Sequence, residues 1–557
     1  MSSFLDKLNR FAKNPVHMDF KRSKFNLSHG AKLTMNSGYL VPVLVDEILP
    51  DDTIKIDVSS VIRSLTVAVP VMDNAYLDLY AFWCPARICC VHDKDWEKVA
   101  GENVAGYWAP ATESTLENTG NTFKFVSGYP VQAQSLADYM GIPIGFYNAN
   151  VGISRLPFNG YWEIWNQWFR DQNVDAPIDW KAHSSNDTGF RAGQATLLAP
   201  VNKFHDYFTS ALPAPQKGNS VLLPMVGNAP VITGADHQTT FKGTIGVNTV
   251  SAGSMIADEN YPLYNHASAV PQGWLTHGST SAGTSVGNTN YIQFTNLYAD
   301  LSNATAASVN DLRQAFALQK LFEKDARGGT RYREILLAHF GVSIPDNTIQ
   351  VPEYLGGKRI PLNMLQVLQT TPTTNAPVGT TGAFSNTADS SYICTKSFSE
   401  FGYVYVLACI RTNQGYSQGV SKMFTRNRRY DFYDPVFANI GEMPVKTIEL
   451  YANNSSDLIT VFGYQEAWAE YRFKPTKICG YLSANSGDSV AQLWTYGNKF
   501  VSAPVLNGDF MKQPKSQIGN TLAITNPTYQ FVCDFFINYT SWRAMPYFSV
   551  PGLIDHH

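Results

Sequence analysis

The chain has 557 residues, more than one ordinary domain, with a formal net charge of −3, 16% charged residues and 13% aromatic residues. An average soluble protein has about 25% charged residues, so a free monomer of this composition would leave wide apolar and neutral areas facing water. Low charge and many aromatic rings are typical of subunit interfaces. The composition therefore favours a subunit of a large assembly, and the alternative is a monomer with an unusually large core.

Several classes of protein fit the sequence poorly. No run of about 18 apolar residues is present, so we expect no membrane insertion. The start, MSSFLDKLNRFAKNP, lacks an apolar core and a small-residue cleavage site, and we expect no secretory signal. The cysteines are too sparse for a disulfide framework and fit a reducing compartment. Because no Cys/His cluster has zinc-ligand spacing, we expect neither a metal nor another cofactor.

Residues 1–50 are expected to form an extended basic arm, which could order on a polyanion. We predict nucleic-acid contacts by Lys21, Arg22 and Lys24 in this arm. From residue 53 the pattern becomes strand-like, because IKIDVSSVIRSLTVAV and AYLDLYAFWC alternate apolar and polar residues over part of their length. The turn MDNA between these two runs predicts that they are antiparallel neighbours.

The stretch LPFNGYWEIWNQWFRDQN, residues 156–173, concentrates aromatic residues at helical spacing, and Pro157 suits the first helical turn. The aromatic stripe comprises Phe158, Tyr161, Trp162, Trp165, Trp168 and Phe169. A platform for stacking bases would need exposed rings interleaved with cations, and no cation lies between these rings. We predict an amphipathic helix whose aromatic face packs on the chain's own core or on a neighbouring subunit. The residues leave both possibilities open.

The second half of the chain mixes loops, helices and strands. Residues 217–296 are rich in Gly, Ser, Thr, Asn and Ala and nearly uncharged, which is typical of a long surface loop. Helices are predicted at 308–326 and at 331–341, the latter ending at Gly341. FGYVYVLACIR, residues 401–411, begins a return to strands. The pattern predicts a mainly β protein, a sandwich or jelly roll with helices and loops inserted.

One motif resembles a catalytic element. GYSQG, residues 415–419, fits the G-x-S-x-G pattern of a nucleophile elbow. Three polar residues separate it from the preceding strand, and the only histidines after it, His556 and His557, lie at the chain end. We therefore interpret it as a Gly/Ser loop and expect the protein not to be an enzyme.

The segment KMFTRNRRYDFY is the strongest cationic signal. Its cations are Lys422, Arg426, Arg428 and Arg429. Arginines interleaved with aromatic residues can follow a phosphate backbone and stack bases, which predicts nucleic-acid contact. The alternative is that these arginines pair with the nearby Asp431 and Asp434.

Seven blocks, in order along the chain, resemble the major capsid proteins of the microviruses, in particular the gokushovirus branch of tailless single-stranded DNA phages. The blocks are LTMNSGYLVPVLVDEILPDDTIKID, DYMGIPIG, LPFNGYWEIWNQWFRDQN, KFHDYFTSALPAPQKG, RYREILLAHFGV with PEYLGG, VFGYQEAWAEYRFKP and PGLIDH. None is a catalytic motif, so the resemblance concerns architecture rather than chemistry.

The resemblance implies a fold and an assembly. The fold would be a single eight-stranded antiparallel jelly roll with large helical and loop insertions. Residues 51–216 would form its first part, 217–296 a surface insertion that makes protrusions at the threefold axes, and 297–557 the remainder. About sixty copies would close a T=1 icosahedral shell around a circular single-stranded DNA genome. The virion would assemble in the bacterial cytoplasm.

The implied partners are a small basic DNA-binding peptide, an internal scaffolding protein and a host surface receptor that the outer loops contact. Two other functions fit the composition. An extracellular carbohydrate-active or carbohydrate-binding β-protein would need an export signal and a carboxylate pair in a cleft. A non-viral cell-surface lattice protein would also need export.

Overall fold

The computed structural model describes residues 22–100, 115–116, 119–181, 190, 193–221, 309–368, 370–371, 378, 381–452, 459–524 and 527–548, with short strands between 231 and 299. The chain divides into two compact units, Met1–Lys217 with Glu323–His557, and Gly218–Phe322. The described strands of the second unit are β8 (Val231–Thr233), β9 (Phe241–Ile245), β10 (Asn248–Ser251), β11 (Tyr264–Asn265), β12 (Gln272–Gly273), β13 (Ile292–Phe294) and β14 (Leu297–Ala299).

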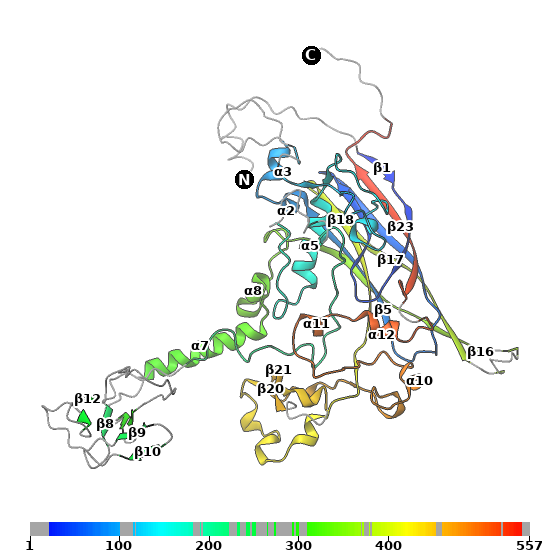
Figure 1. Cartoon of the computed structure of the whole chain (residues 1–557). Coiled ribbons are helices and arrows are strands. Elements are labelled where there is room, and N and C mark those ends of the chain that lie inside the picture. Colours follow the sequence, from blue (N-terminus) through cyan, green and yellow to red (C-terminus); the bar gives the residue numbers. More distant parts are fainter. Residues whose placement is uncertain are drawn as a thin grey trace, which may run out of the picture. The chain divides into compact units, whose positions relative to one another are not determined.

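Two antiparallel sheets form the frame of the first unit (Figure 1). The six-stranded sheet has the order β1 (Ser23–Asn26) and β2 (His29–Met35), both beside β23 (Phe531–Arg543), then β4 (Thr53–Ser64), β17 (Thr381–Ser397) and β16 (Met364–Leu368). The four-stranded sheet has the order β15 (Glu353–Pro361), β5 (Ala75–Pro85), β18 (Gly402–Thr412) and β3 (Val41–Ile48). The prediction of a mainly β, antiparallel protein is confirmed.

The larger core lies between the two sheets. In β23, buried and exposed residues alternate over most of the strand, because successive side chains point to opposite faces of a sheet. Phe535 and Ile56 of the six-stranded sheet join Leu77 and Val406 of the four-stranded sheet in one buried cluster. The other face of the six-stranded sheet carries exposed side chains such as Phe536.

The four-stranded sheet is covered on both faces. Its other face carries Phe82 and Leu407, which belong to a second buried cluster together with residues of α5 (Leu156–Ile164). Nearly every residue of β18 is therefore buried. This explains why FGYVYVLACIR is a continuous apolar run rather than an alternating one, and the strand predicted there is confirmed.

Two expectations for the first part of the chain need correction. The described part of the expected arm, residues 22–50, lies in the sheets as β1, β2 and β3. Because β1 and β2 pair with β23 near the other end of the chain, no local pattern could show this pairing. β4 and β5 are not neighbours, since the connection at 65–74 crosses from one sheet to the other.

The helices after residue 300 follow the expected positions. α7 spans Val309–Arg327, with the division between the two units inside it, and α8 spans Tyr332–Phe340. Gly341 ends α8 with φ of +71°, and its N–H donates to the Leu337 carbonyl over 3.0 Å. The shorter helical elements are α2 (Ala86–Cys89), α3 (Asp95–Val99), α4 (Leu136–Tyr139), η1 (Trp165–Phe169), η2 (Lys422–Thr425), η3 (Arg429–Asp431), η4 (Pro435–Phe437), η5 (Thr447–Glu449), α9 (Ala469–Arg472), η7 (Gly480–Leu482), α10 (Ser489–Gln492), α11 (Gly508–Met511) and α12 (Lys515–Gly519). The remaining short strands are β6 (Thr122–Phe123), β7 (Ile153–Ser154), β19 (Gly415–Tyr416), β20 (Glu442–Lys446), β21 (Val461–Glu466) and β22 (Thr476–Lys477).

Candidate nucleic-acid and assembly surfaces

The aromatic stripe of residues 158–169 packs within its own chain. Tyr161, Trp162 and Trp165 are buried in the cluster that covers the four-stranded sheet. The Tyr161 hydroxyl donates to the Leu40 carbonyl over 2.6 Å, and Trp165 Nε1 donates to the Pro200 carbonyl over 2.8 Å. These bonds satisfy the polar atoms that come with aromatic burial.

The helix changes its winding halfway along the stripe. α5 continues into the π-helical turn η1, where the Arg170 N–H donates to the Trp165 carbonyl over 2.9 Å. Trp168 and Phe169 follow this change and are half-buried rather than fully buried. At the start of the stripe, Gly160 lets α5 approach β18 closely, because an added Cβ would lie 2.3 Å from the Tyr405 hydroxyl.

The cations of segment 422–429 divide into two groups. Arg426 is mostly buried and its Nη2 lies 2.7 Å from Glu470 Oε1, while Lys422 Nζ lies 3.9 Å from the other oxygen of the same carboxylate. Arg428 and Arg429 are exposed, and neither has an ion-pair partner among the residues that the structure describes. The alternative prediction, that these arginines pair with Asp431 and Asp434, is therefore wrong for Arg426, which pairs with Glu470.

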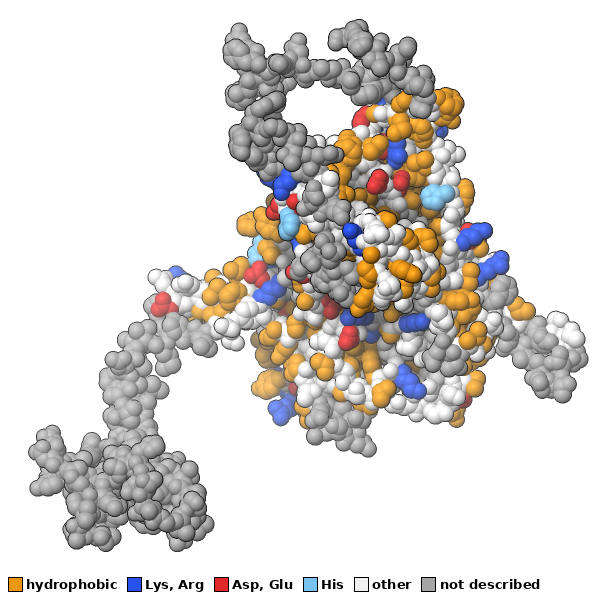
Figure 2. All heavy atoms as spheres, turned by 45° about the horizontal axis from the view of Figure 1, so that its top comes forward, with side chains coloured by type: hydrophobic (Ala, Val, Ile, Leu, Met, Phe, Trp, Pro, Cys, Tyr) orange, Lys and Arg blue, Asp and Glu red, His pale blue; other side chains and the backbone are white. Residues whose placement is uncertain are grey.

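An exposed aromatic patch lies beside Arg426. We define the patch as Tyr430, Phe432, Tyr433 and Tyr471, all of them exposed. The Arg426 guanidinium lies 4.4 Å from the centroid of the Tyr471 ring and 5.9 Å from that of Phe432. Tyr433 and Tyr471 rings lie 6.2 Å apart. Exposed rings concentrated in this way are typical of a contact surface for another molecule. More widely, hydrophobic side chains are spread over the visible surface with few charges between them (Figure 2).

The cations expected in the arm lie at the edge of the six-stranded sheet. Lys24 is exposed on β1, and its Nζ lies 5.7 Å from the ring centroid of Trp542 on the neighbouring strand. Arg22 Nε lies 3.2 Å from the Asp51 carboxylate in an exposed ion pair. Lys21 lies outside the described residues.

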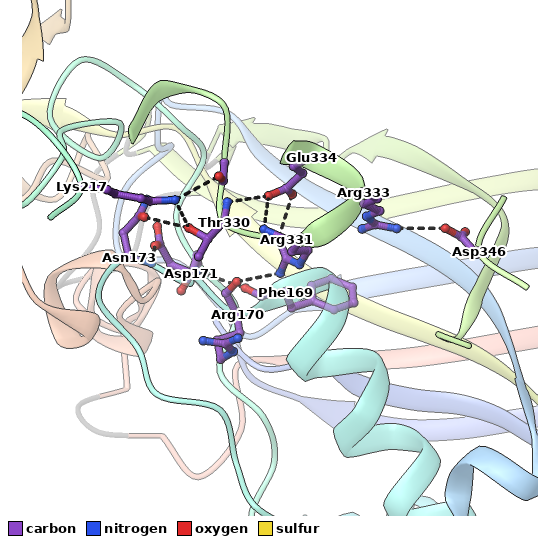
Figure 3. Close-up of polar contacts among 12 residues, drawn as sticks. Phe169, Arg170, Asp171, Asn173, Lys217, Thr330, Arg331, Arg333, Glu334 and Asp346 are labelled. Carbon is purple, nitrogen blue, oxygen red and sulfur yellow. Dashed lines mark hydrogen bonds and ion pairs between the residues drawn. The ribbon is translucent and has the colours of Figure 1, made fainter. Parts of the chain in front are cut away.

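A cavity of about 570 Å³ lies beside the end of η1 and gathers arginines from distant segments. The arginines that line it are Arg170, Arg331, Arg359 and Arg411. Figure 3 shows how Arg331 is held: it pairs with Glu334 over 3.1 Å and donates to the Arg170 carbonyl over 3.1 Å. Arg359 and Arg411 both pair with the buried Asp78. Since these three guanidinium groups are held by carboxylates of the fold, we assign them a structural role.

Other kinds of site receive no support from the described residues. In that part of the chain no three His, Cys, Asp or Glu side chains come together where they could hold a metal ion. None of the described helices is long and apolar enough to cross a membrane. Ser417 of GYSQG accepts a hydrogen bond from the Ala484 N–H over 3.1 Å, which holds two loops together.

Neither the arginine cavity nor the buried Lys203 could be predicted from sequence, because these residues are single cations in unrelated segments. The patch residues, in contrast, lie mostly in one short stretch, where their density was visible beside the arginines.

Comparisons with known proteins place the chain among phage capsid proteins. The family described as "Capsid protein (F protein)" matches residues 16–553. The chain is 38% identical to Capsid protein VP1 of Bdellovibrio phage phiMH2K over 539 residues, which covers 95% of each chain. It is 34% identical to Capsid protein VP1 of Spiroplasma virus 4, covering 96% of this chain and 95% of the relative. It is 32% identical to Capsid protein VP1 of Chlamydia phage 1, covering 98% of both.

Proposed function

The chain belongs to the F-protein family of phage capsid proteins, and from this premise we propose that about sixty copies close a T=1 shell around a circular single-stranded DNA genome. The resemblance to microvirus capsid proteins is confirmed, and the chain is a structural component of a virion. The observation that carries the proposal is the family match over residues 16–553, and the exposed aromatic patch supports it.

The order of the strands supports a single jelly roll. β1 and β2 follow one another along β23 and count as one strand, and β16 extends the sheet beyond β17, which leaves eight strands. Numbered along the chain, one sheet then has the order first, eighth, third, sixth, and the other has the order fifth, fourth, seventh, second. A chain that passes back and forth between two sheets in this way is the pattern of a double Greek key.

Electron microscopy and size-exclusion chromatography of the purified full chain test the assembly. We expect particles of uniform size above a threshold protein concentration, because closure of a shell depends on mass action among copies. A chain that stays monomeric at every concentration and salt condition would contradict the proposal.

We propose that the aromatic patch is covered by a second copy of the chain in the shell. Exchange of Tyr430 and Phe432 for Ser is expected to leave the subunit folded, since both rings are exposed, and to reduce the yield of particles at least tenfold, since exposed rings supply much of an interface's binding free energy. The matched control is Tyr392→Ser, which removes an exposed ring from the six-stranded sheet. Equal particle yields from the two variants, measured by sedimentation, would show that the patch has no role in assembly.

We propose that the DNA contacts include Arg428, Arg429 and Lys24, whose charges are exposed. The double variant Arg428→Gln, Arg429→Gln is expected to form shells that contain less DNA, because each lost phosphate contact weakens binding and lowers its salt dependence. The ratio of absorbance at 260 nm to that at 280 nm in purified particles measures this. The control is Arg426→Gln, which breaks the ion pair with Glu470 and should lower subunit stability instead. Unchanged DNA content in the double variant would rule out these arginines.

We further propose that residues 217–296 form the outer loops that contact the host receptor. The division of Gly218–Phe322 from the rest of the chain as a compact unit supports an insertion at this place. The internal scaffolding protein and the small basic DNA-binding peptide belong to the same proposal, as partners during assembly.

A further inference from the structure

A cavity in the first unit has a polar, cationic lining. Its volume is about 860 Å³, within the range of small-molecule sites. It is lined by the connections around α10, α11 and α12, which supply many hydroxyl and amide side chains. The charged side chains that line it are Lys203, Lys499, Lys512 and Asp509.

Lys203 is the unusual residue of this lining. It is only 4% exposed, and its Nζ lies 4.4 Å from the ring centroid of Phe510, which lines the same cavity. Within the described residues, no carboxylate or carbonyl accepts a hydrogen bond from this amine. The side chain is buried, so its ammonium is hydrated less than that of a surface lysine, and an acceptor inside the cavity would stabilise it. Lys203 also borders the arginine cavity, but its contact with Phe510 places the amine beside the larger one.

The other charges of the cavity do not compensate Lys203. Asp509, the one carboxylate in the lining, accepts from Lys512 Nζ over 2.9 Å. Lys499 Nζ donates to the neutral Gln492 amide over 3.3 Å. Three lysines against one aspartate leave a formal excess of two positive charges in this lining. Asp206 lies close enough to favour the ammonium form, yet burial lowers the pKa of Lys203 to about 8.

A buried amide network gives one wall of the cavity a fixed shape. Gln517 Nε2 donates to Asn498 Oδ1 over 2.9 Å, and Asn498 Nδ2 donates to Gln414 Oε1 over 3.0 Å. All three side chains are buried. Because these bonds hold Gln517 and Asn498 in place, a ligand would meet preformed polar groups and would not have to order them.

We propose that this cavity binds a phosphate group, as the free anion or as the ester of a nucleotide, with Lys203 as its buried charge partner. An anion beside Lys203 supplies the acceptor that the amine lacks, and Lys499 adds a second cation. The Phe510 and Phe500 rings, 6.1 Å apart and nearly parallel, offer an apolar surface for the remainder of a nucleotide. The proposed site does not require a closed shell, because a single subunit can take up free phosphate or a free nucleotide from solution.

Titration calorimetry of the full chain with three probes tests the site: inorganic phosphate, thymidine monophosphate and an eight-residue oligothymidylate. We expect saturable binding of at least one probe by the unchanged chain, and at least tenfold weaker binding by Lys203→Met. Preference for inorganic phosphate identifies a free anion, preference for the monophosphate identifies a free nucleotide, and preference for the oligomer identifies a DNA strand. Sodium acetate, a carboxylate, should bind more weakly than phosphate.

Lys203→Met should fold, because methionine removes a buried ammonium while it keeps a flexible apolar stem against Phe510. The matched control is Lys474→Met, an exposed lysine that does not line the cavity and whose loss should leave binding unchanged. No binding of any probe by the unchanged chain, or equal binding by Lys203→Met, would overturn the proposal. Electron microscopy of Lys203→Met tests the shell separately. If this variant still forms particles, a loss of phosphate binding concerns the cavity alone and leaves the proposed shell untouched.

Discussion

Replacement of Asp78 by Asn is expected to lower the free energy of unfolding of the subunit by about 3–5 kcal/mol. Asp78 is 2% exposed and accepts from the Nε of Arg359 over 2.6 Å and from the guanidinium of Arg411. The Arg411 side chain is only 12% exposed, so loss of the carboxylate leaves a buried cation without its counter-charge. Both guanidinium groups also stack on Phe204, at 4.2 and 4.3 Å from the ring centroid, which keeps them in place after the change.

The matched control for this prediction is Arg359→Gln. The Arg359 side chain is 50% exposed, and water screens its pair with Asp78, so its loss should cost no more than about 1 kcal/mol. Urea denaturation of the dissociated subunit measures both values. Equal losses from Asp78→Asn and Arg359→Gln would mean that the pair with Arg411 contributes little.

Replacement of Trp165 by Ala is expected to lower the free energy of unfolding by about 3–5 kcal/mol, through lost burial and the cavity that remains. Trp165 is 5% exposed and its ring centroid lies 6.2 Å from that of Trp162. Because these contacts lie within one chain, the loss should not depend on protein concentration. The control is Tyr481→Ala, an exposed ring whose removal should change stability by less than about 0.5 kcal/mol.

Urea denaturation at several protein concentrations tests whether the aromatic stripe stabilises the single chain or the contact between subunits. A loss for Trp165→Ala that appears only when particles are present would instead place the stripe between subunits.

Local patterns predicted several elements well, since their causes are local. The 3.6-residue spacing of aromatic residues after Pro157 and the glycine after Phe340 predicted α5 and the end of α8. The apolar run at residues 401–411 predicted the strand β18, and the structure adds that both faces of this strand are covered. The density of rings and arginines at residues 422–433 predicted nucleic-acid contact, and this role stays a prediction.

Pairings over long distances needed the folded chain. Arg426 is held by Glu470 and not by an aspartate of its own segment, and a carboxylate 44 residues away leaves no local pattern. The π-helical turn that begins at Trp165 was not predicted either, because the helical stripe assumed a constant 3.6-residue period up to Phe169.

The sequence was enough to identify a β-rich capsid subunit with little charge. Assembly shapes the overall composition, which any sequence shows, and the family resemblance lies in contiguous motifs that can be read without coordinates. Three features required the fold: β1 and β2 beside β23, the two arginines on Asp78, and the solitary amine of Lys203. Each joins positions that are hundreds of residues apart or depends on a missing partner. Short-range periodicity carries no information about either, since only close packing in three dimensions brings such groups together or leaves one alone.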